Sequence, residues 1–169
     1  MNIKEEIKSI NWKDYTTISK NSLEIPELLM ALFLTDKVKV QKAIDRLWES
    51  LCHQHSFITS PALPSYKFLR YALLNLENEI KVDILDIFLG FTRCLKKSHF
   101  ESLGRDPFWW ELSLQKLINE DKKIFESFVL NENEDISCFS TLILNALDNN
   151  ETDISFELNW DDFPPPNPR

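Results

Sequence analysis

The stretch Cys52-His53-Gln54-His55 gathers the side chains of this sequence that are best suited to chemistry. Cysteine and histidine are zinc ligands, and a cysteine beside a histidine is a candidate nucleophile. A zinc ion needs further ligands, and no Cys-x-x-Cys or His-x-x-x-His pair supplies them. On a helix, His53 and His55 also point about 200° apart. We therefore predict a helix C-terminus with no metal and no cofactor, and keep as an alternative a small helical enzyme with its site near Cys52–His55.

The other groups with catalytic potential lack a partner at useful spacing. Cys94 and His99 lie five residues apart across an expected helix end, without an orienting Asn or Asp. Asp83 and Asp86 are a carboxylate pair of the kind that any acidic chain contains, and they are expected on a solvated helix surface. No catalytic residue is predicted, and a non-enzymatic protein is the main hypothesis.

Aromatic residues supply the first candidate binding group. Phe108, Trp109 and Trp110 are consecutive, so all three cannot face one core. Tryptophan is a favoured anchor in protein interfaces. Trp109 and Trp110 are therefore predicted to bind a protein partner or to lie at a seam between helices.

Acidic residues supply the second candidate group, because the net charge of −8 is unevenly distributed. Residues 1–119 hold 15 Asp/Glu and 16 Lys/Arg, whereas residues 120–169 hold 12 and 3. A surface of one sign raises the rate of encounter with an oppositely charged partner. It also opposes nucleic-acid binding, which needs an excess of Lys and Arg. We predict a basic protein partner, contacted by Glu132, Glu134, Asp135, Asp153, Asp161 and Asp162.

Residues 149–169 form a segment of distinct composition, acidic and then rich in proline. A solvated, disordered terminus is one interpretation of this segment. Its Trp160 and Phe163 favour a binding role, with the neighbouring carboxylates steering the approach to a basic partner. Two alternatives remain open: the segment folds back on the nearly neutral N-terminal part, or it is the peptide that an adaptor presents for recognition.

The rest of the chain predicts an all-α domain over residues 1–148. Only two glycines occur, Gly90 and Gly104, which disfavours hairpin-rich β folds and phosphate-binding loops. Apolar residues recur at helical spacing. The expected helices cover residues 3–10, 26–34, 37–54, 61–76, 80–97, 107–117, 122–130 and 135–147, with caps at Asp36, at Thr59 or Ser60 and at Asp106, and a loop over residues 98–106.

The sequence also predicts the compartment. The three cysteines are odd in number and widely spaced, which disfavours a disulfide framework. Residues 1–8 alternate in charge without an apolar signal core, and no apolar run approaches the length of a membrane span. A cytoplasmic protein without a membrane partner is expected.

Residues 47–69 resemble small bacterial proteins of the HEAT-like repeat class. The matching positions are Trp48, Ser50, Cys52, His53, Gln54, Ala62, Pro64 and Leu69. The match departs from the class where no glycine follows Gln54. The resemblance implies a HEAT-like α-solenoid of stacked antiparallel helical hairpins that serves as a binding scaffold. Many acidic proteins of this class look like antidotes to secreted toxins. By that analogy we expect an immunity protein, a monomer or a 1:1 complex, that neutralises a basic polymorphic or contact-dependent toxin domain. If that domain is a nuclease, the carboxylates mimic phosphates.

Overall fold

A computed structural model describes residues 2–17 and 22–148, and this part of the chain is helical without a strand. The expected all-α class is confirmed. The helices are α1 (Ile3–Ser9), α2 (Ile25–Ala31), α3 (Lys37–Leu51), α4 (Ala62–Asn75), α5 (Asn78–Cys94), α6 (Lys97–Ser102), α7 (Trp109–Glu120), α8 (Lys122–Phe128) and α9 (Glu134–Leu147). Short 3₁₀ turns occur at Trp12–Asp14, Ser22–Glu24 and His53–His55.

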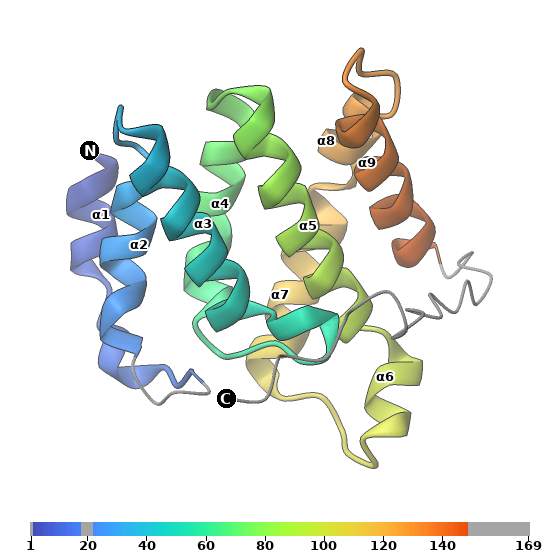
Figure 1. Ribbon diagram of the computed structural model, residues 1–169. Coiled ribbons are helices and arrows are strands. Elements are labelled where there is room, and N and C mark those ends of the chain that lie inside the picture. Colours follow the sequence, from blue (N-terminus) through green and yellow to red (C-terminus); the bar gives the residue numbers. More distant parts are fainter. Residues whose placement is uncertain (1, 18–21, 149–169) are drawn as a thin grey trace, which may run out of the picture.

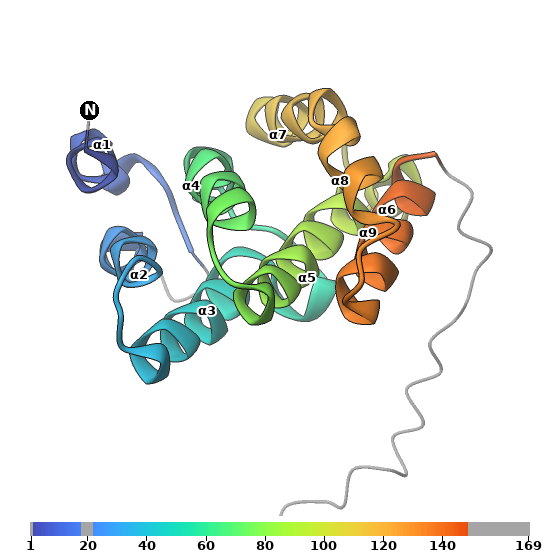
Figure 2. The same cartoon turned by 90° about the horizontal axis from the view of Figure 1, so that it is seen from above.

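The helices lie in two layers around α5 (Figure 1). Seen from above, α3, α5 and α9 form one row (Figure 2). The helices α4 and α7 both lie on one side of this row and belong to the second layer. The helix α5 contacts α3, α4, α6 and α9. It is therefore the element against which segments distant in the sequence are positioned.

One continuous hydrophobic core runs from α1 to α9, and aromatic rings form its centre. Phe88 of α5 makes edge-to-face contacts with three rings, at centroid distances of 5.2 Å to Tyr66, 6.1 Å to Phe91 and 5.7 Å to Phe125. Such pairs add about 0.5–1.5 kcal/mol each to the stabilisation from burial. These contacts join α4, α5 and α8 into one body.

Several local predictions are confirmed. Asp36 caps α3, its carboxylate accepting hydrogen bonds from the amides of Val38 and Lys39. Pro26 lies in the first turn of α2. The apolar residues Val40, Ala43, Ile44, Leu47 and Leu51 recur at helical spacing in α3 and are buried, and Trp48 on the same face is partly exposed.

Two predicted helix starts are wrong. Neither Thr59 nor Ser60 caps α4, whose N-cap position is Pro61. Thr59 instead serves the preceding helix: its hydroxyl donates to the carbonyl of Ser50 and its amide to that of Leu51. Because these bonds satisfy the terminal carbonyls of α3, that helix ends at Leu51 and not near residue 54.

The expected loop over residues 98–106 is also wrong, because α6 occupies most of it. The helix α7 begins at Trp109 after Phe108, so Asp106 does not cap it. The amide of Phe108 donates to the carboxylate of Glu111 at 2.7 Å. A buried glutamate one turn into the helix thus replaces the expected aspartate cap.

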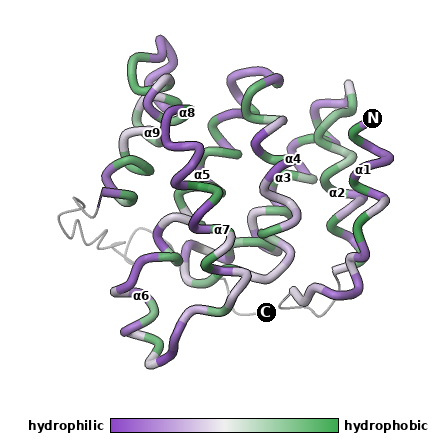
Figure 3. The backbone as a smooth tube through the Cα atoms, turned by 180° about the vertical axis from the view of Figure 1, so that it is seen from behind, coloured by the Kyte–Doolittle hydropathy of each residue, from purple (hydrophilic) through white to green (hydrophobic). Residues whose placement is uncertain are grey.

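Each helix contains both hydrophilic and hydrophobic residues, as the colouring of Figure 3 shows. Among the described residues, none of the helices combines the length and the apolar content that crossing a membrane requires.

Candidate protein-binding surfaces

The Cys52–His55 string forms a sharp connection between α3 and α4. Cys52 follows the last turn of α3, and residues 53–55 form a single 3₁₀ turn. His55 has a φ of 53° and is the one non-glycine residue with positive φ in the described part of the chain. The histidine therefore takes the left-handed conformation that glycine adopts without steric cost, and this position carries backbone strain.

Contacts with α5 hold this strained residue in place. His55 Nε2 lies 3.0 Å from Asp86 Oδ1, without the alignment of a hydrogen bond, and Nδ1 lies 3.3 Å from Arg93 Nη1. The thiol of Cys94 donates to the carbonyl of His55 at 3.3 Å. The string thus fastens the α3–α4 connection to α5.

Gly90 makes this close approach possible. A Cβ at position 90 would lie 2.7 Å from Cδ2 of His55 and 2.8 Å from Sγ of Cys52. Both distances are below van der Waals contact. The glycine in the middle of α5 is therefore explained by the side chains that cross it.

The surroundings of the two thiols oppose nucleophilic chemistry. Burial raises the pKa of Cys94 to about 12 and raises that of Cys52 well above its usual value. The bonding partner of Cys94 is the His55 carbonyl, and His99 has a pKa lowered by burial and by Arg105. Over residues 2–17 and 22–148, no three His, Cys, Asp or Glu side chains have the arrangement of metal ligands.

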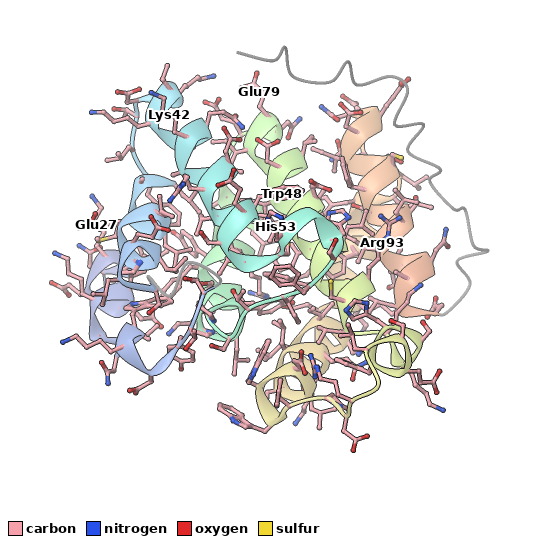
Figure 4. All side chains as sticks on the ribbon, turned by 60° about the horizontal axis from the view of Figure 1, so that its bottom comes forward. Glu27, Lys42, Trp48, His53, Glu79 and Arg93 are labelled. Atoms are coloured by element: carbon pink, nitrogen blue, oxygen red, sulfur yellow. The ribbon has the colours of Figure 1, made fainter. Side chains whose placement is uncertain are left out.

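An acidic groove lies between α3 and α5. Its volume is about 210 Å³, and it is lined by Ile44, Asp45, Trp48, Glu49, Asp83 and Asp86. The amide of Gln41 donates to Asp45 and to Asp83, both at 3.1 Å, and so links the two helices. Trp48 lies where α3 faces α5, close to the 3₁₀ turn that contains His53 (Figure 4). The structure thus gathers four carboxylates that are up to 41 residues apart in sequence.

In the part of the chain that the structure describes, two polar groups at the acidic groove lack a full set of favourable partners: the carboxylate of Asp83 and the indole N–H of Trp48. Burial raises the pKa of Asp83, and the neighbouring charges of Asp45 and Asp86 raise it further, although the bond from Gln41 acts in the opposite direction. The indole Nε1 of Trp48 is buried and donates to no acceptor among the described residues. A cation near Asp83 would therefore relieve the repulsion between the carboxylates.

A second surface is apolar and lies where α6 meets α7. Leu103, Phe108, Trp109 and Leu112 are exposed there, and we call them the α6–α7 surface. Trp109 is 69% exposed. Trp110 is partly buried against the core, with its ring stacked on Phe108 at 6.3 Å. The two predicted tryptophans thus differ: Trp109 is available to a partner, and Trp110 supports the packing beneath it.

A buried ion pair holds the α6–α7 surface in place. Glu111 is 1% exposed, and Arg105 binds it through two hydrogen bonds of 2.7 and 2.8 Å. The guanidinium also lies 5.3 Å from the ring of Phe100 and 4.5 Å from that of Phe108. The sequence analysis did not predict this pair. Its signal in the sequence is an arginine six residues before a glutamate that lies among apolar residues in the first turn of a helix.

The predicted partner-binding residues that the structure describes lie in two separate places. Glu132, Glu134 and Asp135 are exposed at the α8–α9 connection, at the top of Figure 1, whereas Trp109 is the first residue of α7, which begins near α6 at the opposite end of the molecule. Two of these acids are in the first turn of α9, where negative charge also stabilises the helix dipole. The remaining predicted residues, Asp153, Trp160, Asp161, Asp162 and Phe163, lie outside the described part of the chain.

These features describe an all-helical protein with one acidic groove and one apolar surface. Comparison with protein families, with curated proteins and with solved structures finds no match to this chain. The functional argument accordingly depends on the site itself.

Proposed function

We propose that this protein is a non-enzymatic binding protein that holds a basic protein domain through the acidic groove. The observation that carries the proposal is the convergence of Asp45, Glu49, Asp83 and Asp86 on one hollow beside Trp48. Glu49 has Arg46 at 3.6 Å, whereas the charges of Asp45 and Asp86 oppose ionisation of Asp83. A partner's lysine or arginine offsets that repulsion.

The groove suits a long basic side chain. Its volume of about 210 Å³ accommodates an alkyl stem against Ile44 and Trp48, with the cationic head among the carboxylates. Exposed ion pairs contribute about 0.2–1 kcal/mol each, so three such contacts give specificity and fast association more than very tight binding. Binding through this groove is therefore sensitive to salt.

The helix layers support a HEAT-like scaffold as the finer description of the fold. The helices of the pairs α4–α5 and α8–α9 pack against each other, and α3, α5 and α9 form a row. A row of helical hairpins presents an extended surface to a macromolecule. By the resemblance of residues 47–69 to HEAT-like proteins, we extend the proposal to a cytoplasmic immunity protein whose target is a basic toxin domain, bound as a 1:1 complex.

The test is capture from a lysate of the source organism with the full-length chain and three matched variants. The groove variant carries Asp45→Asn, Glu49→Gln and Asp83→Asn, and it leaves Asp86 to His55. The tip variant carries Glu132→Gln, Glu134→Gln and Asp135→Asn. A control variant carries Glu5→Gln, Glu27→Gln and Glu126→Gln, three exposed carboxylates elsewhere. Each variant loses the same charge, so a general charge effect lowers capture equally in all three.

The expected result is one basic protein, captured in stoichiometric amount by the wild type and the control, released by high salt and lost with the groove variant. Loss with the tip variant alone would transfer the binding site to the α8–α9 connection. Equal capture by all four proteins would contradict an acidic binding surface. The adaptor alternative is tested by the same assay, because it predicts that a partner is retained by all three variants.

A further inference from the structure

A continuous hollow leads from the end of α9 to the α6–α7 surface. Its first part, of about 130 Å³, is lined by Ala146 and Leu147 of α9 together with Leu95, Lys97 and Gln115. The same Leu95, Lys97 and Gln115 also line the second part, of about 530 Å³. The chain therefore leaves its last described helix at the edge of this hollow.

The far part of the hollow has an apolar portion that opens onto exposed hydrophobic side chains. Phe100, Pro107 and Leu112 line it, and Leu112 is also a member of the α6–α7 surface. Leu112 lies one turn after Phe108 and next to the exposed Trp109 on the first turns of α7. Hydrophobic side chains gathered in this way mark a surface that binds something.

Cations line both parts of the hollow. Lys97 lines both and is 91% exposed, and its pairing with Glu101 at 3.4 Å is a surface contact of small energy. Lys96 lines the first part and Arg105 the second, where Glu101 and Asp106 are the acidic side chains. The acidic Glu111 beneath the surface is neutralised by Arg105.

The residues that follow α9 have the complementary pattern. In residues 153–161, Ile154, Phe156, Leu158 and Trp160 alternate with polar or acidic residues. In an extended chain, alternate side chains point to opposite faces, so these four share one apolar face. The carboxylates of Asp153, Glu157 and Asp161 share the other.

The segment is long enough to run along α7. The twelve residues from Asn149 to Trp160 reach about 40 Å when extended. The twelve residues of α7 span about 18 Å. Because the segment is tethered to the hollow, its effective concentration there is of the order of millimolar, and weak contacts are sufficient to hold it.

We infer that residues 153–163 of this chain bind the hollow between α6 and α7 in extended form, with their apolar face on the α6–α7 surface. Trp160 covers Trp109, and the acidic face is directed toward Lys97. This inference is independent of the acidic groove and of its partner. It selects the fold-back interpretation of the C-terminal segment, onto α6 and α7, over a segment that waits for a basic partner.

The test is photo-crosslinking in the full-length protein, with p-benzoylphenylalanine in place of Trp109 and mass-spectrometric mapping of the products. The expected product is a crosslink within one chain to residues 153–163. The matched control places the same probe at Leu130, which is 93% exposed in the α8–α9 connection. That connection lies at the end of the molecule opposite to α6 (Figure 1). The control is expected to give no crosslink to that segment.

Two further full-length variants test the register. Phe156→Ser, Leu158→Ser and Trp160→Ser together are expected to abolish the crosslink, because they remove the apolar face. Ser155→Ala with Asn159→Ala alters the other face and is expected to preserve it.

Three results would overturn the inference: crosslinks between two chains, which indicate a second copy as the occupant; crosslinks to other regions or none at all; and a crosslink that survives loss of the apolar face. None of these results depends on whether the acidic groove binds a partner.

Discussion

Replacing Gly90 by alanine tests the packing at the centre of the molecule. An added methyl group would lie 2.7 Å from Cδ2 of His55, 2.8 Å from Sγ of Cys52 and 3.2 Å from its Cβ. Both neighbours are packed against other groups. Cys52 is fully buried, and His55 is held by its contacts with Asp86 and with the thiol of Cys94.

The magnitude follows from two opposing effects. Overpacking of a core costs about 1–3 kcal/mol. Alanine in the interior of a helix returns up to about 1 kcal/mol relative to glycine. Because two rigid groups collide with the methyl group, we expect Gly90→Ala to lower the free energy of unfolding by about 1–2 kcal/mol. For a chain of this size, that is a fall in Tm of roughly 2–8 °C.

The assay is urea and thermal unfolding followed by circular dichroism, with two comparisons. Gly104→Ala is the contrasting variant, because Gly104 has a φ of 63° but no atom within 4 Å of an added Cβ, so its cost is backbone strain alone. The background His55→Gly removes the ring and relaxes the strained φ. In that background Gly90→Ala should cost measurably less than in the wild type. If Gly90→Ala instead stabilises the protein by about 1 kcal/mol, as helix propensity alone requires, the described packing of the α3–α4 connection on α5 is refuted.

Three further outcomes follow from buried or strained groups. Glu111→Ala removes the partner of Arg105 and the acceptor for the amide of the Phe108 N-cap, and it should lower stability by about 3 kcal/mol, or roughly 6–12 °C in Tm by calorimetry. Asp83→Asn should raise the urea midpoint at pH 7, because the folded state raises the pKa of this carboxyl and its ionised form therefore opposes folding. Cys138 is exposed and should react with a thiol reagent in the native protein, whereas Cys52 and Cys94 should react only on unfolding.

The sign of the Asp83 effect fixes its pH dependence. Between the unfolded pKa of about 3.9 and the raised folded value, the native state binds more protons than the unfolded state, so stability falls as pH rises. The gain from Asp83→Asn should therefore vanish near pH 3.5. An equal gain at both pH values would contradict an electrostatic origin. For the other two predictions, the contradicting results are a Glu111→Ala variant as stable as wild type and native labelling of all three cysteines.

The helices were predictable where local signals and tertiary packing agree. The Asp36 cap and the apolar face of α3 needed no information from elsewhere in the chain. The six-residue helix α6 was missed because tertiary contacts define it: Phe100 is its buried residue, and Arg105 lies against that ring. A short helix of this kind has too little local preference to be recognised in isolation.

The binding surfaces were predictable only in part. The exposure of Trp109 follows from three consecutive aromatics that cannot share one core. The acidic groove did not follow, because its four carboxylates come from two helices and any one of them resembles an ordinary solvated residue. The approach of Cys52 and His55 to Gly90 likewise depends on how α3 and α5 pack, which the spacing of residues within one helix does not determine.

The most direct measurement of the central claim is the affinity of the captured basic protein for the wild-type chain and for the groove variant, by titration calorimetry at low and at high salt. Loss of three ion pairs at about 0.2–1 kcal/mol each predicts a Kd roughly three- to 150-fold weaker for the groove variant, with the difference shrinking at high salt. The control variant should match the wild type. Equal Kd values for the wild type and the groove variant at low salt would contradict the assignment of the acidic groove as the binding site.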